Sequence, residues 1–526
     1  IRLYESRFDD PKQRARLIKT YGFDRSLTAQ YSIWMKRLAT GQWGYSRHYR
    51  RPVFSDILKA TGFTLIHLMW TAVSYTIWTI ILKMIGRLRT RKPLHALAPN
   101  DYNLRWLEAI PSFLIALILY DIAVWHLGWA DLVNVSLFDP AYYRKPLVMF
   151  IPTSALALTP LIVWHVQSRH VRAYRAHPPS QAGRWTYYAL RWRHFSQRFR
   201  PLLGYFLMEL LLIEYIFTLP GLGNVGVTAI RRRDFPLLQG FILAAGGLYI
   251  VLIMVFDRYS RGSQENDSAR YQIVNDKSNP TSLREVVRPM LGLLALLALA
   301  NWAPDLSPHD ATEIHTYDQL LSPNSRYVLG TDFLGRDVLS RTLLGFRASI
   351  PRVFLITLLI AALSILLSIV TRLVPRGLQQ FCHSIPVLFE AFPPFLLTFM
   401  VFVVVDQQHW SLEIALLSAG IPGGFVLFCR KESALQRIAN LASIGKLVLL
   451  LDVIFFFLRL SPEPFTPTWG GDIRIGAQYS HINVWALLSP IIAVICSQMV
   501  FHQFSISLLP SPKAHTTSHY VASEQS

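Results

Sequence analysis

Long runs of apolar residues, separated by shorter polar stretches, make up most of the chain. A membrane-spanning helix needs about twenty mostly apolar residues, and eleven runs are candidates, although some are short or interrupted. They lie near residues 58–84, 107–128, 147–166, 202–219, 238–256, 288–302, 349–371, 384–405, 413–429, 447–460 and 484–506. Because lipid offers no hydrogen-bond partners, each run must be helical or enclosed by protein. The pattern therefore predicts an all-α integral membrane protein with about eleven transmembrane helices.

A polar stretch near the middle divides the chain into two tandem halves. Residues 257–287 are rich in Gly, Ser and Asn and have no apolar periodicity, which is typical of a linker. With a boundary near 275, the first half covers 1–274, with a segment at 1–57 followed by five spans. The second half covers 275–509 and has six spans, and the polar tail 510–526 is predicted to be disordered.

The composition fits a membrane protein, with 52% hydrophobic and 16% charged residues. A net charge of +20 would suggest nucleic acid in a soluble protein, but the basic residues concentrate in connections between spans. Connections 85–106 and 167–201 are Arg-rich, so both are expected to face the cytoplasm, with 1–57 outside and the C-terminal tail inside. The lipid bilayer, and no nucleic acid, is therefore the first expected partner.

Residues 327–350, YVLGTDFLGRDVLSRTLLGFRASI, contain the most specific motif of the chain. They closely resemble the stretch before the second transmembrane helix in one permease subunit of dipeptide, oligopeptide and nickel ABC importers. The shared positions are Leu329, Gly330, Thr331, Asp332, Gly335, Arg336, Asp337, Ser340, Arg341, Gly345, Arg347 and Ser349.

A second motif lies in the first half and resembles the extracytoplasmic segment near the end of the partner permease subunit. Its matching positions are Glu214, Phe217, Pro220, Gly221, Leu222, Gly223, Ala229, Ile230, Arg233, Asp234, Pro236, Gln239 and Gly240. Residues 22–53 also resemble the segment after that subunit's first helix, which implies that this helix is missing before Ile1. The two motifs, in this order, imply two tandem type I ABC permease-like halves fused in one bacterial inner-membrane chain.

The resemblance implies the permease subunit of an importer for peptides or similar small solutes. Such binding-protein-dependent transport uses separate ABC ATPase subunits, which bind the ATP, and an extracytoplasmic solute-binding protein. The expected ATPase-coupling loops are eroded, however: 167–201 has no EAA-like string. Residues 430–446 keep plausible coupling residues, namely Arg430, Glu432, Ala439 and Gly445. The alternative is a degenerate permease that serves as a non-transporting structural subunit of a larger membrane protein complex.

The two motifs have a physical logic of their own. Gly221 and Gly223, after Pro220, are expected to permit a tight re-entrant turn with positive φ, which can form a gate. In the motif at residues 327–350, Asp332 or Asp337 can accept backbone N–H groups while Arg336 pairs with a carboxylate. A rigid elbow is favoured there over direct substrate contact. The predicted outer-gate residues are Glu214, Pro220, Gly221, Gly223, Asp234, Gly330, Thr331, Asp332, Gly335, Arg336 and Asp337.

Ionisable residues inside the apolar runs are further candidates. A charge at the centre of a bilayer costs about 2.5–3.5 kcal/mol, so Glu209 and Glu390 should face protein or a polar cavity. They are hypotheses for contact with substrate or protons, with packing against an Arg an equal alternative. The histidines of the first half, such as His67, could in principle bind haem or a metal, but ordinary hydrogen bonding is the favoured role for them. The chain has no phosphate loop, GxSxG or HExxH motif, so neither an enzyme nor a resident cofactor is expected.

Overall fold

The computed structural model describes residues 24–90, 110–123, 152–157, 195–196, 199–261, 283–375, 378–379, 393–405, 410–429, 433–460 and 466–508. Within these ranges the regular structure is helical, and the β contacts are two isolated bridges, Tyr45 with Pro52 and Thr331 with Asp337. The predicted all-α class is confirmed.

Seven helices of the described ranges are long and apolar enough to cross a membrane. They are α4 (Val53–Thr90), α12 (Phe235–Arg261), α14 (Leu283–Leu306), α15 (Val338–Leu373), α18 (Ser411–Cys429), α19 (Ala434–Phe457) and α21 (Trp485–Ser507). Three further predicted runs contain shorter apolar helices, α5 (Ser112–Asp121), α10 (Leu203–Ile216) and α17 (Pro394–Val404). Of the run 147–166, the structure describes 152–157, which are helical. Each predicted run therefore contains helix in the part that the structure describes.

Short helices lie between the apolar ones and were not predicted. They are α3 (Leu27–Ala39), the 3₁₀ turn η6 (Arg200–Leu202), α11 (Leu222–Arg231) and α20 (Trp469–Tyr479). Helices α11 and α20 each pack against the apolar helix that follows them, α12 and α21. Helix α11 begins directly after Gly221 of the first-half motif, whereas α20 begins at Trp469, outside both motifs.

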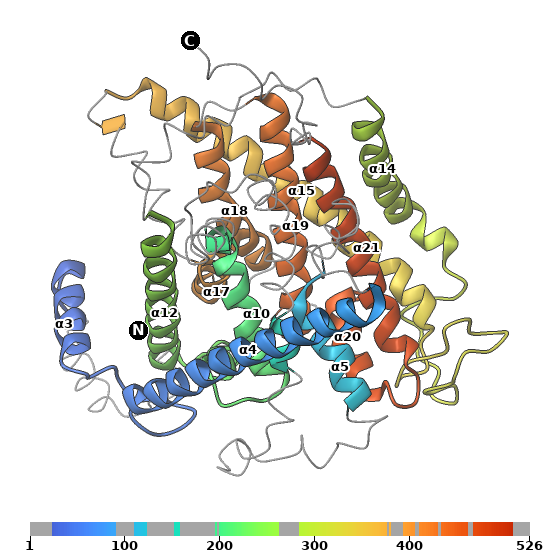
Figure 1. Cartoon of the computed structure of the whole chain (residues 1–526), viewed down its shortest axis with the longest axis horizontal. Coiled ribbons are helices and arrows are strands. Elements are labelled where there is room, and N and C mark those ends of the chain that lie inside the picture. Colours follow the sequence, from blue (N-terminus) through green and yellow to red (C-terminus); the bar gives the residue numbers. More distant parts are fainter. Residues whose placement is uncertain are drawn as a thin grey trace.

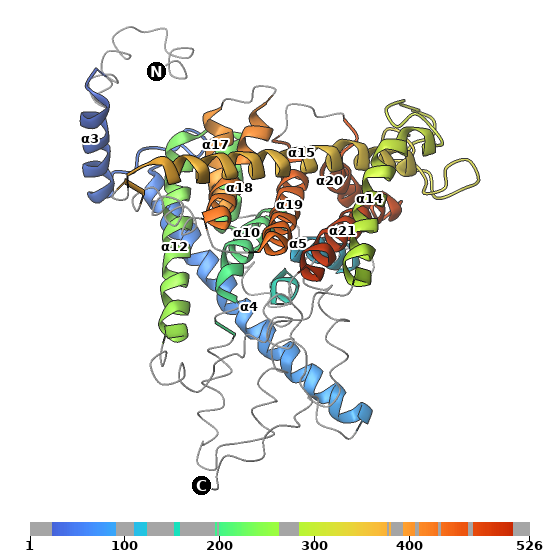
Figure 2. The same ribbon diagram turned by 90° about the horizontal axis from the view of Figure 1, so that it is seen from above.

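The second half is organised around α15, which contacts α14, α18, α19, α20 and α21 and runs across them in Figure 2. In the first half, α4 packs against α11 and α12 (Figure 1), and its far end extends away from the bundle in Figure 2. The halves meet where α10 contacts α17 and where the rings of Phe113 and Phe457 lie 6.4 Å apart. One buried apolar cluster contains residues of both halves, so they share a core.

Helix α19 differs from its prediction. We expected a span at 447–460 after an inner connection at 430–446, but the helix begins at Ala434 and runs unbroken to Phe457. Ser433 starts it with a capping box, in which its hydroxyl accepts the N–H of Gln436 and the Gln436 side chain accepts the N–H of Ser433. The predicted 14-residue run was too short to cross a bilayer, which explains the earlier start. The connection from α18 to α19 is therefore only 430–433.

Candidate functional site

The motif of the first half forms a turn between α10 and α11, residues 214–223, which we name the Glu214 turn. Glu214 is fully buried at the end of α10, and its Oε2 accepts the backbone N–H of Gly223 at 2.7 Å. Its backbone carbonyl accepts the N–H of Leu219 at 2.7 Å. One residue thus fixes both sides of the turn. A buried carboxylate needs such donors, because an unpaired charged oxygen is costly in an apolar environment.

Helix α4 binds this turn from the side. His67 Nδ1 lies 2.6 Å from Glu214 Oε1, and Thr64 Oγ1 accepts the N–H of Leu222 at 2.9 Å. Thr64 and His67 are three residues apart and therefore share one face of α4. His67, considered above as a metal ligand, is thus a hydrogen-bonded buried histidine, and the described residues contain no group of three metal-type ligands.

The glycines of this turn are required for a different reason from the one predicted. Gly221 has φ −92°, so the expected positive φ is wrong, and the positive φ of the turn belongs to Thr218 at 51°. A Cβ at Gly221 would instead overlap the Glu214 carboxylate, and one at Gly223 would overlap the backbone carbonyl of Leu211. The glycines let the chain approach α10 closely.

Asp234 connects this region to the segment that precedes α4. Its Oδ2 accepts the Ser46 hydroxyl at 2.6 Å and the His48 N–H at 3.0 Å. Its Oδ1 accepts the N–H of Leu237 in the first turn of α12 at 3.3 Å. The carboxylate therefore caps α12 and joins two segments that lie 188 residues apart in the chain.

The motif of the second half forms the turn before α15, residues 330–337, which we name the Asp332 turn. Asp332 Oδ1 accepts the N–H groups of Leu334 at 2.9 Å and Arg336 at 3.0 Å, and its Oδ2 accepts from Arg336 Nε at 2.8 Å. Gly330 and Gly335 have φ of +74° and +75°, which glycine adopts without strain. The predicted carboxylate–backbone bonds and the Arg336 ion pair are present.

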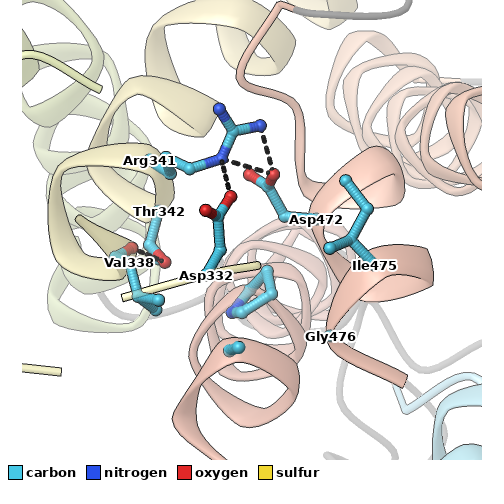
Figure 3. A pocket seen from close by; sticks show the side chains of 9 residues that line it. Asp332, Val338, Arg341, Thr342, Asp472, Ile475 and Gly476 are labelled. Atoms are coloured by element: carbon cyan, nitrogen blue, oxygen red, sulfur yellow. Dashed lines mark hydrogen bonds and ion pairs between the residues drawn. The ribbon is translucent and has the colours of Figure 1, made fainter. Parts of the chain in front are cut away.

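Asp337 caps α15, since its Oδ2 accepts the N–H of Ser340 at 3.0 Å. One turn further on, Arg341 Nε donates to Asp472 Oδ1 of α20 at 2.8 Å and lies 3.8 Å from Asp332 Oδ2 (Figure 3). Arg341 and Asp472 are both buried. Burial raises the pKa of the Asp472 carboxyl, and the Arg341 guanidinium opposes that rise.

A small cleft opens beside this cluster and is lined by Asp332, Arg341, Thr342, Asp472 and Ile475, among others (Figure 3). Its free space suits about one water molecule. Asp472 Oδ2 is buried and accepts no hydrogen bond within the described part of the chain. Sequence reasoning missed Asp472, which lies three residues after Trp469.

A second network, centred on the buried Asp452, lies about 16 Å further along α15, since Arg352 follows Arg341 by eleven positions. Arg352 Nη1 donates to Asp452 Oδ1 of α19 at 2.8 Å, and Ser349 Oγ donates to Asp452 Oδ2 at 2.9 Å. Glu413 of α18 lies 3.9 Å from Arg352 Nε. Hydrogen bonds and ion pairs thus join the three membrane helices α15, α18 and α19. The single acid within the apolar string LVLLLDVIFFF was the signal that could have found it.

The remaining predicted residues do not gather at one place. Glu390, Arg430 and Glu432 lie outside the described residues. Ala439 is fully buried within α19, and a Cβ at Gly445 would touch Phe501 of α21 at 3.0 Å. These two candidate coupling residues therefore pack inside the bundle.

Comparison with known proteins adds an independent line of evidence. No family model matches the chain. The nickel transport system permease protein NikC of Escherichia coli (strain K12) is 26% identical over 245 residues, which cover 40% of this chain and 87% of that protein. The glutathione transport system permease protein GsiD of Pectobacterium atrosepticum is 27% identical, covering 44% of this chain and 91% of its own. The dipeptide transport system permease protein DppB of Bacillus subtilis is 25% identical, covering 45% and 78%.

The chain is a homologue of ABC importer permeases. Each match covers most of the relative's length but less than half of this chain. One permease subunit therefore does not account for the whole chain. The homology and the apolar helices together make it a multi-pass inner-membrane protein.

Proposed function

We propose that this chain is the permease subunit of an ABC-type importer and carries peptides or similar small solutes across the inner membrane. The observation that supports this most is the length of the matches: nickel, glutathione and dipeptide permeases each match 40–45% of the chain over at least 78% of their own length. A chain with two such halves supplies both membrane subunits that an importer of this kind needs.

The geometry supports the proposal through two rigid turns, one in each half. The Glu214 turn and the Asp332 turn both start from a buried acid that accepts backbone N–H groups. Both sit beside a long membrane helix, α4 in one half and α15 in the other. We propose that they form the outer ends of a path between the halves. In this orientation the C-terminus is cytoplasmic.

The proposed partners are separate ABC ATPase subunits, which bind the ATP, and an extracytoplasmic solute-binding protein. ATP-driven closure of an ATPase pair moves a permease only through contacts that differ between its two states. The second candidate function, a non-transporting structural subunit, is favoured by one observation. Helices α18 and α19 are joined by residues 430–433 alone, and so short a connection offers little surface for an ATPase to dock on in the second half.

Purification of the full chain from its native membrane, followed by identification of the co-purifying proteins, separates the two functions. An importer is expected to carry an ATPase with it and to give ATP-dependent uptake of a labelled dipeptide in proteoliposomes. Stable association with an unrelated complex, with no ATPase and no uptake, would contradict the transport function. To test ATPase coupling, residues 167–201 and residues 430–433 are replaced by neutral linkers in two separate variants. Unchanged uptake in both variants would refute ATPase docking at these connections.

A further inference from the structure

Helix α3 carries an apolar stripe that faces away from the fold. Leu27, Tyr31 and Met35, which we name the α3 stripe, follow one another at intervals of four and therefore share one face of the helix. Within the described part of the chain their exposed fractions are 82%, 60% and 44%. The other face turns toward α12, since Trp34 Nε1 donates to Gln239 Oε1 at 3.3 Å. An apolar face left exposed in this way indicates a second partner.

The contacts of α3 place it at the level of the membrane surface. Gln239, which Trp34 binds, is the fifth residue of the candidate membrane span Phe235–Arg258. Helix α4 begins at the same level, because a Cβ at Gly240 would lie 2.7 Å from the side chain of Val53, its first residue. Both spans thus start at one membrane surface, and α3 lies beside this start, at the edge of the molecule (Figures 1 and 2).

Aromatic side chains gather at the same level. The ring centroids of Tyr31 and Trp34 are 5.7 Å apart, and those of Trp43 and Phe54 are 5.3 Å apart. Trp43 Nε1 also donates to the backbone carbonyl of Leu38 at 3.1 Å and so holds the end of α3 near the start of α4. Tyr and Trp are enriched where membrane meets water, because their rings have an apolar body and a polar edge. This composition is typical of a helix at a membrane interface.

The charges around the α3 stripe favour an anionic surface. Residues 24–40 contain three basic residues, Arg25, Lys36 and Arg37, against one acid, Asp24. Lys36 directly follows Met35 and is itself exposed, so a positive charge lies at the edge of the stripe. Basic residues beside an apolar helix face bind anionic lipid headgroups, whereas a neutral or acidic rim gains nothing from them.

We propose that α3 lies in the membrane interface and binds phospholipids with a negatively charged headgroup. The α3 stripe enters the boundary between the headgroups and the acyl chains, and Lys36 contacts the lipid phosphate groups. The exposed Phe54 and Leu58, one turn apart at the start of α4, continue this surface along the first membrane span. The surface does not depend on transport, so it holds for either of the two functions considered above.

Such a contact fixes the depth of α4 in the membrane. Residues 40–52 join α3 to α4, and within them Ser46 is bound to Asp234 at the start of α12. Helix α4 in turn holds the Glu214 turn through Thr64 and His67. The lipid contact therefore supports, from the membrane surface, the same helix that positions this turn.

The test replaces Tyr31 of the full chain with the photo-reactive residue p-benzoylphenylalanine in the native membrane. After irradiation, mass spectrometry identifies the molecules that became attached. Tyr317 is the matched control, because it is fully exposed in the connection between α14 and α15. We expect phospholipid adducts at position 31 and none at position 317. Attachment to a protein at position 31 would show a protein-docking surface and overturn the proposal, and so would the absence of any adduct there or equal lipid adducts at both positions.

The choice of anionic lipid is tested with the same photo-reactive chain, purified in nanodiscs of equal parts phosphatidylethanolamine and phosphatidylglycerol. We expect phosphatidylglycerol in the adducts at position 31 to exceed phosphatidylethanolamine by at least about twofold. Arg25→Gln combined with Lys36→Gln, both at exposed side chains, should remove this excess. Arg258→Gln, at the opposite end of α12, is the control and should keep it. An excess that the double variant keeps would overturn the assignment of anionic lipid.

Discussion

The Glu214 turn and the Asp332 turn solve the same problem in different ways. Both place a buried acid beside a tight turn that leads into a helix. In the first half the carboxylate pairs with a histidine of α4, and glycines let the backbone approach α10. In the second half the carboxylates pair with Arg336 and Arg341, and glycines supply positive φ. One turn therefore depends on shape and the other on paired charge.

The largest expected effect is at the charged turn. Arg341→Met removes the cation that lies between Asp472 and Asp332 and leaves two buried acids close together. We expect a loss of about 4 kcal/mol in the free energy of unfolding. Thermal unfolding of the purified chain in detergent measures this loss as a lower midpoint. Arg326→Met, at an exposed ion pair, is the matched control and should cost less than about 1 kcal/mol. Equal effects would show that the buried cluster adds nothing.

At the Glu214 turn, His67→Ala should be the most damaging single change. It leaves Glu214 Oε1 buried without the partner that now lies at 2.6 Å. We expect a cost of about 3 kcal/mol in the same unfolding experiment. A double-mutant cycle with Glu214→Gln isolates the pair, because the neutral amide has less need of His67. Additive costs in that cycle would mean that the two side chains act independently.

Gly223→Ala tests whether the first turn depends on shape. The added methyl group meets the backbone carbonyl of Leu211 within α10, which cannot move aside as a flexible side chain can. A destabilisation of about 2 kcal/mol is expected from this overlap. Gly62→Ala is the control, because a Cβ there has nothing within 4 Å and should stabilise α4 slightly. If both variants unfold at the same midpoint as the wild type, close packing is not what requires Gly223.

The smallest effect is expected at the cap of α15. Asp337→Ala removes the acceptor for the Ser340 N–H and should cost about 1 kcal/mol, detected by the same unfolding midpoint. Asp337→Asn keeps an oxygen at the same position and should recover most of this loss. If Asp337→Ala lowered the free energy of unfolding as much as Arg341→Met, the stability of the Asp332 turn would depend on the helix cap rather than on the ion pairs.

The sequence predicted the membrane helices well because lipid restricts a spanning segment to one kind of backbone structure. It also predicted the local bonds of the Asp332 turn, which join residues two to four positions apart. The pairing of Arg341 with Asp472, 131 residues away, depends on the packing of α15 against α20 and leaves no local pattern. The start of α19 was misplaced because Arg437, Asn440 and Lys446 interrupt the apolar pattern of its first turns, so these turns resemble a polar connection.

The bond between His67 and Glu214 also has a consequence for synthesis and insertion. These residues are 147 positions apart, so at bacterial rates of translation the histidine emerges on the order of ten seconds before its partner. During that interval the polar face of α4, with Thr64 and His67, has no turn to bind and must be tolerated by the insertion machinery or shielded by a chaperone. Helix α4 thus enters the membrane before the partners of its polar face have been synthesised. Ribosome-bound chains should therefore resist protease at α4 only after residue 223 has been inserted.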